Sequence, residues 1–93
     1  MRVKFKSFGP FRRILESSIL ELEMQSGATV EDVIAKVIEI AGPKLEQLIM
    51  EEERISGNLI VMLNKRDVNT LGGLGEPIKD DDEVTILPHV QGG

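Results

Sequence analysis

The chain has 93 residues, enough for one domain with a single hydrophobic core and too few for a deep catalytic cleft between domains. Hydrophobic residues make up 41% of it, yet there are only three Phe and no Trp or Tyr, so we expect an aliphatic core. The lack of cysteine excludes disulfides, thiolate metal sites and thiol chemistry by this chain, and it fits a reducing cytoplasm.

The net charge of −5 argues against nucleic acid as a partner, because phosphate binding needs a dominant basic field. Basic side chains nevertheless gather before Glu16, where no acidic residue occurs. We interpret this segment as the solvated face of a strand, with a docking patch as the alternative. No apolar stretch approaches a membrane span and the N-terminus is no secretory signal, so we expect a cytoplasmic protein with no membrane partner.

Period-two alternation predicts two strands near the N-terminus. Residues 2–7 alternate basic side chains with Val, Phe and Ser, and Gly9-Pro10 ends this run. Residues 20–25 alternate Leu, Leu and Met with Glu, Glu and Gln. Two such runs close in sequence predict an antiparallel hairpin.

Helical periodicity follows the hairpin. Thr29 is a suitable N-cap, acidic residues occupy the first turn, and residues 30–41 carry one apolar stripe. Gly42-Pro43 stops this helix. Leu and Ile spacing predicts a second short helix at residues 45–49, followed by a charged loop at residues 51–54.

The remaining chain predicts two more strands. Residues 59–63 form an unbroken apolar run, typical of a strand covered on both faces. A turn at residues 64–67 and an irregular glycine-rich segment at residues 70–77 come next. A tight acidic turn at residues 80–83 leads into a last strand at residues 84–88. The fold class is therefore α+β, with a small mixed sheet wrapped on one main helix.

Candidate catalytic and metal sites are poorly supported. The glycines at residues 72–75 lack the Gly-Lys-Ser/Thr of a phosphate loop, and the acidic turn lacks the ligand spacing of a calcium loop. His89 is the only histidine, so no histidine-based triad or zinc site is possible within the chain. We therefore expect no metal site and no enzyme in its own right.

The C-terminal segment PHVQGG has the properties of a reactive tail, although leftover linker is the alternative. Pro88 cannot donate a ladder hydrogen bond, so it favours release of the chain from the sheet, and six residues extend roughly 20 Å. Glycine has no Cβ, so Gly92 and Gly93 fit a channel too narrow for other residues. A terminal carboxylate, with an ordinary pKa of about 3.5, can attack the α-phosphate of ATP, provided that a second protein supplies the catalysis.

Four segments carry a family resemblance, and together they span nearly the whole chain: FKSFGPFRRIL, GATVEDVI, VMLNKRDV and PIKDDDEVTILPHVQGG. The chain resembles the MoaD/ThiS family of ubiquitin-like β-grasp sulfur carriers, which includes the small subunit of molybdopterin synthase and archaeal small modifier proteins. Asp81 stands where the family usually has Gly. Because Asp tolerates a left-handed turn, we expect the fold to survive this change.

The resemblance implies a domain plan and a set of roles. A β-grasp domain occupies residues 1–88 and a flexible tail occupies residues 89–93. Gly93 carries the adenylate and then the thiocarboxylate or isopeptide bond, while Val90, Gln91 and Gly92 thread the partner's active site. The implied partners are an adenylating enzyme of the ubiquitin-activating type and either a molybdopterin synthase large subunit or target-protein lysines. No cofactor is bound, and the activating enzyme consumes ATP.

Strand parity predicts a docking face at the root of the tail. Phe8 falls in phase with the basic positions of the first strand, and Leu87 falls out of phase with Val84 and Ile86. We predict that Phe8, Leu87 and Arg12 bind a partner protein. The alternative is that the two apolar side chains plug the ends of the core.

The sequence is compatible with three functions. The first is a sulfur carrier of the molybdopterin-synthesis type, and the second is a modifier joined through Gly93 to lysines of other proteins. One protein can serve both roles, because the activated intermediate is shared. The third is an interaction domain with an inert tail.

Overall fold

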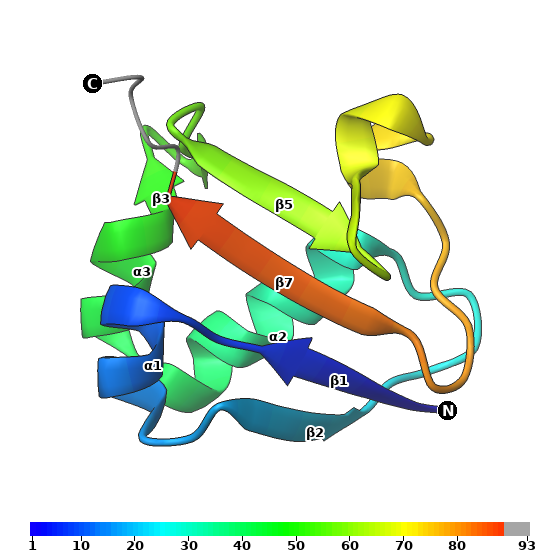
Figure 1. Ribbon diagram of the computed structural model, residues 1–93, viewed down its shortest axis with the longest axis horizontal. Coiled ribbons are helices and arrows are strands. Elements are labelled where there is room, and N and C mark those ends of the chain that lie inside the picture. The colour runs from blue at the N-terminus through cyan, green and yellow to red at the C-terminus, as the bar shows by residue number, and fades with distance from the viewer. Residues whose placement is uncertain (89–93) are drawn as a thin grey trace.

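The computed structural model describes residues 1–88 (Figure 1). The elements, in chain order, are β1 (Arg2–Lys6), α1 (Gly9–Leu15), β2 (Ile19–Glu23), α2 (Val30–Ala41), α3 (Pro43–Ile49), β3 (Met50–Glu51), β4 (Arg54–Ile55), β5 (Leu59–Leu63), β6 (Arg66–Asp67), the 3-10 turns η1 (Val68–Thr70) and η2 (Gly73–Gly75), and β7 (Glu83–Pro88). No helix in this part of the chain has the length and apolar character needed to cross a membrane.

The main sheet has the strand order β2-β1-β7-β5-β6. Strands β1 and β7 lie side by side in parallel, with Lys4 opposite Glu83, and the other neighbours are antiparallel. The predicted hairpin is confirmed, with Arg2 opposite Glu23 and Lys6 opposite Ile19. The last strand in the sequence therefore lies in the middle of the sheet, where both of its edges are hydrogen-bonded.

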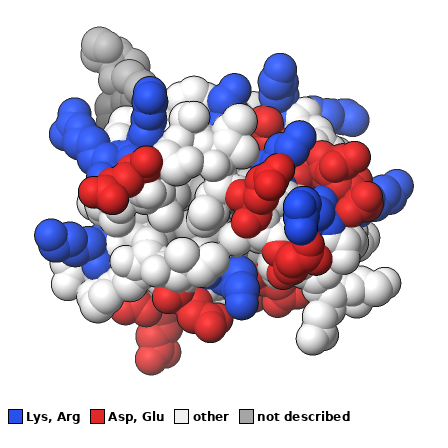
Figure 2. All heavy atoms as spheres, turned by 90° about the horizontal axis from the view of Figure 1, so that it is seen from below, with Lys and Arg blue, Asp and Glu red and all other residues white. Residues whose placement is uncertain are grey.

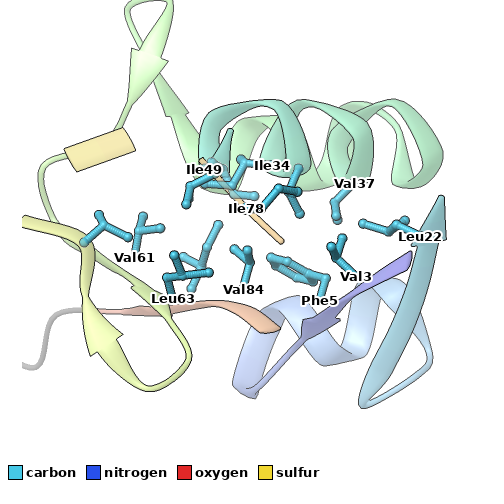
Figure 3. Close-up of a cluster of buried hydrophobic side chains, with 14 of the residues drawn as sticks. Val3, Phe5, Leu22, Ile34, Val37, Ile49, Val61, Leu63, Ile78 and Val84 are labelled. Atoms are coloured by element: carbon cyan, nitrogen blue, oxygen red, sulfur yellow. The ribbon is translucent and has the colours of Figure 1, made fainter. Parts of the chain in front are cut away.

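The core lies between one face of the sheet and the helices. Side chains from β1, β5 and β7 point toward α2 and α3, as the close-up in Figure 3 shows. Val3, Phe5 and Val84 from the sheet and Val33 and Val37 from α2 are fully buried. No helix in the described part of the chain covers the opposite face of the sheet (Figure 1). The predicted mixed sheet packed on one main helix is thus confirmed.

The start of α2 is fixed as predicted. Thr29 is its N-cap and accepts a hydrogen bond from the Asp32 amide at 3.3 Å, while the Asp32 carboxylate accepts one from the Thr29 amide at 2.9 Å. This reciprocal arrangement is a capping box, which satisfies two amides that a helix start leaves free. Gly42, with φ +90°, ends the helix at the predicted place.

One helix was missed, and one prediction of a loop was wrong. The connection after β1 contains α1, whose Phe11 is buried, because Pro10 lies in the first turn of a helix, where the missing amide is harmless. The charged segment at residues 51–54 is the β3–β4 hairpin, with Glu52 and Glu53 in left-handed conformations in its turn. Positive φ at two successive positions is the geometry of a tight hairpin turn.

A third correction concerns β5, which was expected to be covered on both faces. Only Val61 and Leu63 are buried, and the intervening Ile60 and Met62 are half-buried. Because successive side chains of a strand point to opposite faces, Ile60 and Met62 face the side of the sheet that no described helix covers. The run is therefore apolar although only one of its faces is buried in the core. Ile60 and Met62 therefore add apolar surface to the uncovered sheet face.

The acidic turn before β7 is held by hydrogen bonds of its own carboxylates. Asp80 accepts from the Arg2 amide at 2.8 Å, and Asp82 accepts from the Lys79 amide at 2.7 Å and from the Asn64 side chain at 2.9 Å. Asp81 has φ +70°, the left-handed conformation expected for this position. Within residues 1–88, no cluster of three His, Cys, Asp or Glu side chains is arranged to hold a metal ion.

Candidate functional site

Strand β7 delivers the chain to the point where the tail begins. It pairs with β5 through to its end, with Leu87 opposite Ile60 and Pro88 opposite Leu59. Pro88 is exposed, and the residues that follow it lie outside the described part of the chain. The predicted domain boundary after residue 88, the flexible tail and the roles of Val90, Gln91, Gly92 and Gly93 therefore remain predictions.

An apolar hollow lies on the uncovered sheet face near this point. It has a volume of about 160 Å³ and is lined by Lys6, Phe8, Met62, Lys65, Glu83, Thr85 and Leu87. We call this set of residues the sheet-face patch. Because Phe8 and Leu87 both line it, the structure brings together two of the three predicted partner-binding residues.

Strand parity explains why Phe8 and Leu87 meet. Val84 and Ile86 are fully buried on the helix side, so Leu87 extends to the opposite side of β7. Phe8 follows β1 with extended dihedrals, φ −135° and ψ 160°, and keeps the alternation of Lys4 and Lys6. Its side chain is 41% exposed.

Neither Phe8 nor Leu87 belongs to the hydrophobic core or packs against it. This placement favours the predicted docking face over the alternative in which these side chains plug the ends of the core. An apolar surface that the fold itself does not use for packing is typical of an interaction site.

Basic groups surround the apolar part of the patch. The Lys6 ammonium lies 5.3 Å from the centre of the Phe8 ring, a cation–π arrangement that holds the ring over the strand. Lys65 stands in the β5–β6 turn with φ +69°, and Glu83 is the only acidic residue among residues 1–88 that lines the hollow. At the other end of β1, hydrogen bonds to Glu23 raise the pKa of Arg2.

Arg12 lies outside the sheet-face patch. It is one helical turn beyond Phe8, whose carbonyl accepts a hydrogen bond from the Arg12 amide at 3.4 Å. Its exposed side chain lines a separate shallow hollow with Gly9, Arg13 and Glu16. The structure thus places Arg12 next to Phe8 along the chain, on the neighbouring surface of α1.

Sequence reasoning assigned a partner-binding role to two of the seven residues of the patch, Phe8 and Leu87, and missed the other five, which are Lys6, Met62, Lys65, Glu83 and Thr85. Thr85 is buried although it faces the side without helices, because the larger side chains of the patch cover it. The side of the sheet that Thr85 faces could be predicted from strand alternation, because it lies between the inward-facing Val84 and Ile86. Met62 was missed because the whole run at residues 59–63 was predicted to be covered.

Comparison with known proteins assigns the chain to a family. The family model described as ThiS family matches residues 6–93, a range that includes all of the sheet-face patch and the two terminal glycines. The chain belongs to the ThiS family. Members of this family are ubiquitin-like carrier proteins and not catalysts.

Three similar proteins illustrate the range of the family. A putative sulfur carrier protein of Archaeoglobus fulgidus is 32% identical over 74 residues, which cover 80% of this chain and 83% of that protein. The solution structure of small archaeal modifier protein 1 from Methanosarcina acetivorans is 29% identical, covers 99% of this chain and 96% of that one, and has a TM-score of 0.85.

The third is the crystal structure of the BexX/CysO complex of Amycolatopsis orientalis, 30% identical, with 98% of this chain and 99% of the matched chain covered and a TM-score of 0.75. These matches confirm the predicted ubiquitin-like β-grasp fold. They also confirm the resemblance to sulfur carriers and archaeal modifiers.

Proposed function

We propose that this protein is a carrier whose Gly93 carboxylate is adenylated by an enzyme of the ubiquitin-activating type and then converted to a thiocarboxylate for sulfur transfer. The observation that carries the proposal is the ThiS family match, which extends through Gly92 and Gly93. The sulfur-carrier name of the Archaeoglobus fulgidus relative supports the same role. The protein itself is a cosubstrate with no catalytic residue of its own, and the activating enzyme binds and consumes the ATP.

The proposed chemistry takes place at one carbon atom. The Gly93 carboxylate attacks the α-phosphate of ATP, the bond to the β-phosphate breaks, and pyrophosphate leaves. Hydrosulfide then attacks the acyl carbon, AMP leaves with the bonding electron pair, and the resulting thioacid loses its proton to water to give the thiocarboxylate. Such chemistry belongs in the cytoplasm, where ATP and reduced sulfur are available.

The sheet-face patch is the proposed contact with the activating enzyme. It presents the apolar surface of the exposed Phe8 and the half-buried Leu87 beside the root of the tail, with Lys6 and Lys65 around it. A partner that covers this surface gains hydrophobic contact while it receives the tail in a narrow channel. Arg12, on the adjoining surface of α1, is proposed to contact the rim of the same partner.

A second fate of the activated carboxylate is conjugation. The amine of a target lysine attacks the same acyl carbon, loses a proton and forms an isopeptide bond as AMP leaves. The similarity to small archaeal modifier protein 1 of Methanosarcina acetivorans favours this fate alongside sulfur transfer. The sulfur-transfer partner would be a molybdopterin synthase large subunit, and the conjugation partners would be lysines of other proteins.

The test is an intact-mass measurement after incubation with ATP, a matching activating enzyme and sulfide. We expect a mass gain that equals the exchange of one oxygen for sulfur, and we expect none in a control variant that lacks Gly92 and Gly93. An unchanged mass in the full-length protein, under conditions in which pyrophosphate is released, would rule out the sulfur-carrier role.

Conjugation has its own readout in cell extracts. Lys79 is the last basic residue, so trypsin should leave the peptide DDDEVTILPHVQGG attached to each target lysine. Finding such branched peptides establishes the modifier role. Their absence, at good coverage of the proteome, would exclude it.

A further inference from the structure

A second hollow lies on the helix side of the molecule, between α2, α3, the β3–β4 hairpin and η2. Its volume is about 550 Å³, and it shares no lining residue with the sheet-face patch. We call it the helix-side groove. Its floor is apolar and is formed by Ile34, Ala35, Ile38, Met50, Ile55 and Leu74.

Four carboxylates stand around this floor, against a single cation. Glu31 and Glu39 come from α2, Glu46 from α3 and Glu53 from the hairpin turn, while Arg54 is the one basic lining residue that the described chain supplies. Among residues 1–88, ion pairs are formed only by Arg2, so none of these carboxylates is neutralised within the described fold. Figure 2 shows the uneven spread of charge on one face, with basic side chains along its upper margin and acidic ones along much of its lower margin.

Two of the four carboxylates have no stabilising role in their own elements. Glu39 lies in the last turn of α2, where a negative charge opposes the helix dipole. Glu53 occupies a left-handed position, with φ +68°, where residues without a β-carbon are favoured. Since neither position favours Glu for the sake of the fold, both fit a role in binding.

We infer that the helix-side groove docks a short amphipathic helix of another protein whose apolar stripe is flanked by lysine or arginine. Glu31, Ala35 and Glu39 are spaced by four residues and form one ridge of α2, about 12 Å long, which matches two turns of a helix. Because the exposed side chain of Ala35 is only a methyl group, the backbone of the partner helix can approach α2 closely between Glu31 and Glu39. Apolar side chains of the partner helix cover the floor of the groove, and its lysine or arginine side chains contact the carboxylates around the floor.

The site differs from the proposed contact of the activating enzyme. The sheet-face patch has two lysines and one carboxylate around its apolar part, whereas the groove has four carboxylates and one arginine. The two surfaces therefore select partners of opposite charge. A cationic partner helix can stay bound while the sheet face is engaged by another protein.

The test is an NMR titration of the ¹⁵N-labelled protein with two synthetic peptides. Both form an amphipathic helix of about three turns with the same leucine stripe, and one carries Lys and the other Glu at the flanking positions. We expect only the lysine peptide to shift amide signals of α2, α3 and the β3–β4 hairpin, and we expect added salt to weaken its binding.

Two double variants make the charge argument specific. The change Glu39→Gln with Glu53→Gln should weaken binding of the lysine peptide about fivefold, since each exposed ion pair contributes modestly. The matched control, Glu16→Gln with Glu21→Gln, removes the same charge, includes one left-handed position and lies outside the groove. Equal weakening by both pairs, equal binding of both peptides, or shifts confined to Phe8 and Leu87 would each overturn the inference.

A floor variant tests the contact itself. Ala35→Trp places a large side chain in the groove at an exposed helix position, so the protein should fold normally and lose the lysine peptide. The unfolding curve shows whether the fold is intact. Undiminished binding by the folded variant would contradict docking along this ridge.

Discussion

Phe8 and Leu87 show how strand geometry alone turns single side chains away from the core. Each is apolar and points to the sheet face opposite to that of its buried neighbours along the strand, and neither packs on the core. Their positions could be predicted from sequence because alternation in a strand is strict. The same alternation places Thr85 on this side of β7, but its pairing with Met62 could not be predicted, since it depends on the register between β5 and β7.

Replacing Phe8 tests the docking role of the patch. Phe8→Asp should raise the KM for the carrier about tenfold or more in pyrophosphate exchange by a matching activating enzyme, because it puts a charge in the apolar contact. Stability should change little, since the side chain is 41% exposed and lies outside the core.

Leu48→Asp is the matched control for this experiment. Leu48 is equally exposed, at 41%, but lies on α3 away from the sheet-face patch. It should leave the KM unchanged. If both variants raise the KM alike, the effect reflects general surface properties and the patch is not the contact.

Helices and strands could be predicted from the sequence where a capping residue or a regular hydrophobic period marks them locally. The hairpin of β1 and β2, the helix α2 and the strand β7 follow from alternation or from a capping residue. Helix α1 was missed because Gly9-Pro10 was interpreted only as the end of a strand, although proline also favours the first turn of a helix. The β3–β4 hairpin was missed because Glu52 and Glu53 lack the Gly or Asn typical of its turn.

The capping box gives a prediction at this scale. Thr29→Ala removes the hydroxyl oxygen that accepts a hydrogen bond from the Asp32 amide, so it should lower the free energy of unfolding by about 1 kcal/mol. Thr29→Ser keeps that oxygen and should stay within a few tenths of a kcal/mol of the original protein. Urea denaturation measures both, and an alanine variant as stable as the serine variant would show that the box contributes nothing.

For the whole molecule, the fold divides its surface into two sides with different chemistry. The sheet side carries the sheet-face patch beside the root of the tail, where lysines flank apolar side chains. The helix side carries the helix-side groove, where carboxylates flank an apolar floor. This division was beyond prediction from sequence, because each surface combines residues from distant segments. The groove joins α2 and α3 to η2, and the patch joins β1 to β5 and β7.

The central claim is that bonds are made and broken only at the carboxylate of Gly93, while the folded domain serves for recognition. Its most direct test is one alanine added after Gly93, with ATP–pyrophosphate exchange measured against the unaltered protein and a matching activating enzyme. We predict loss of exchange with an unchanged melting temperature, because the added methyl group does not fit a channel made for glycine. Full exchange by the extended protein, with its mass confirmed after the reaction, would contradict the account.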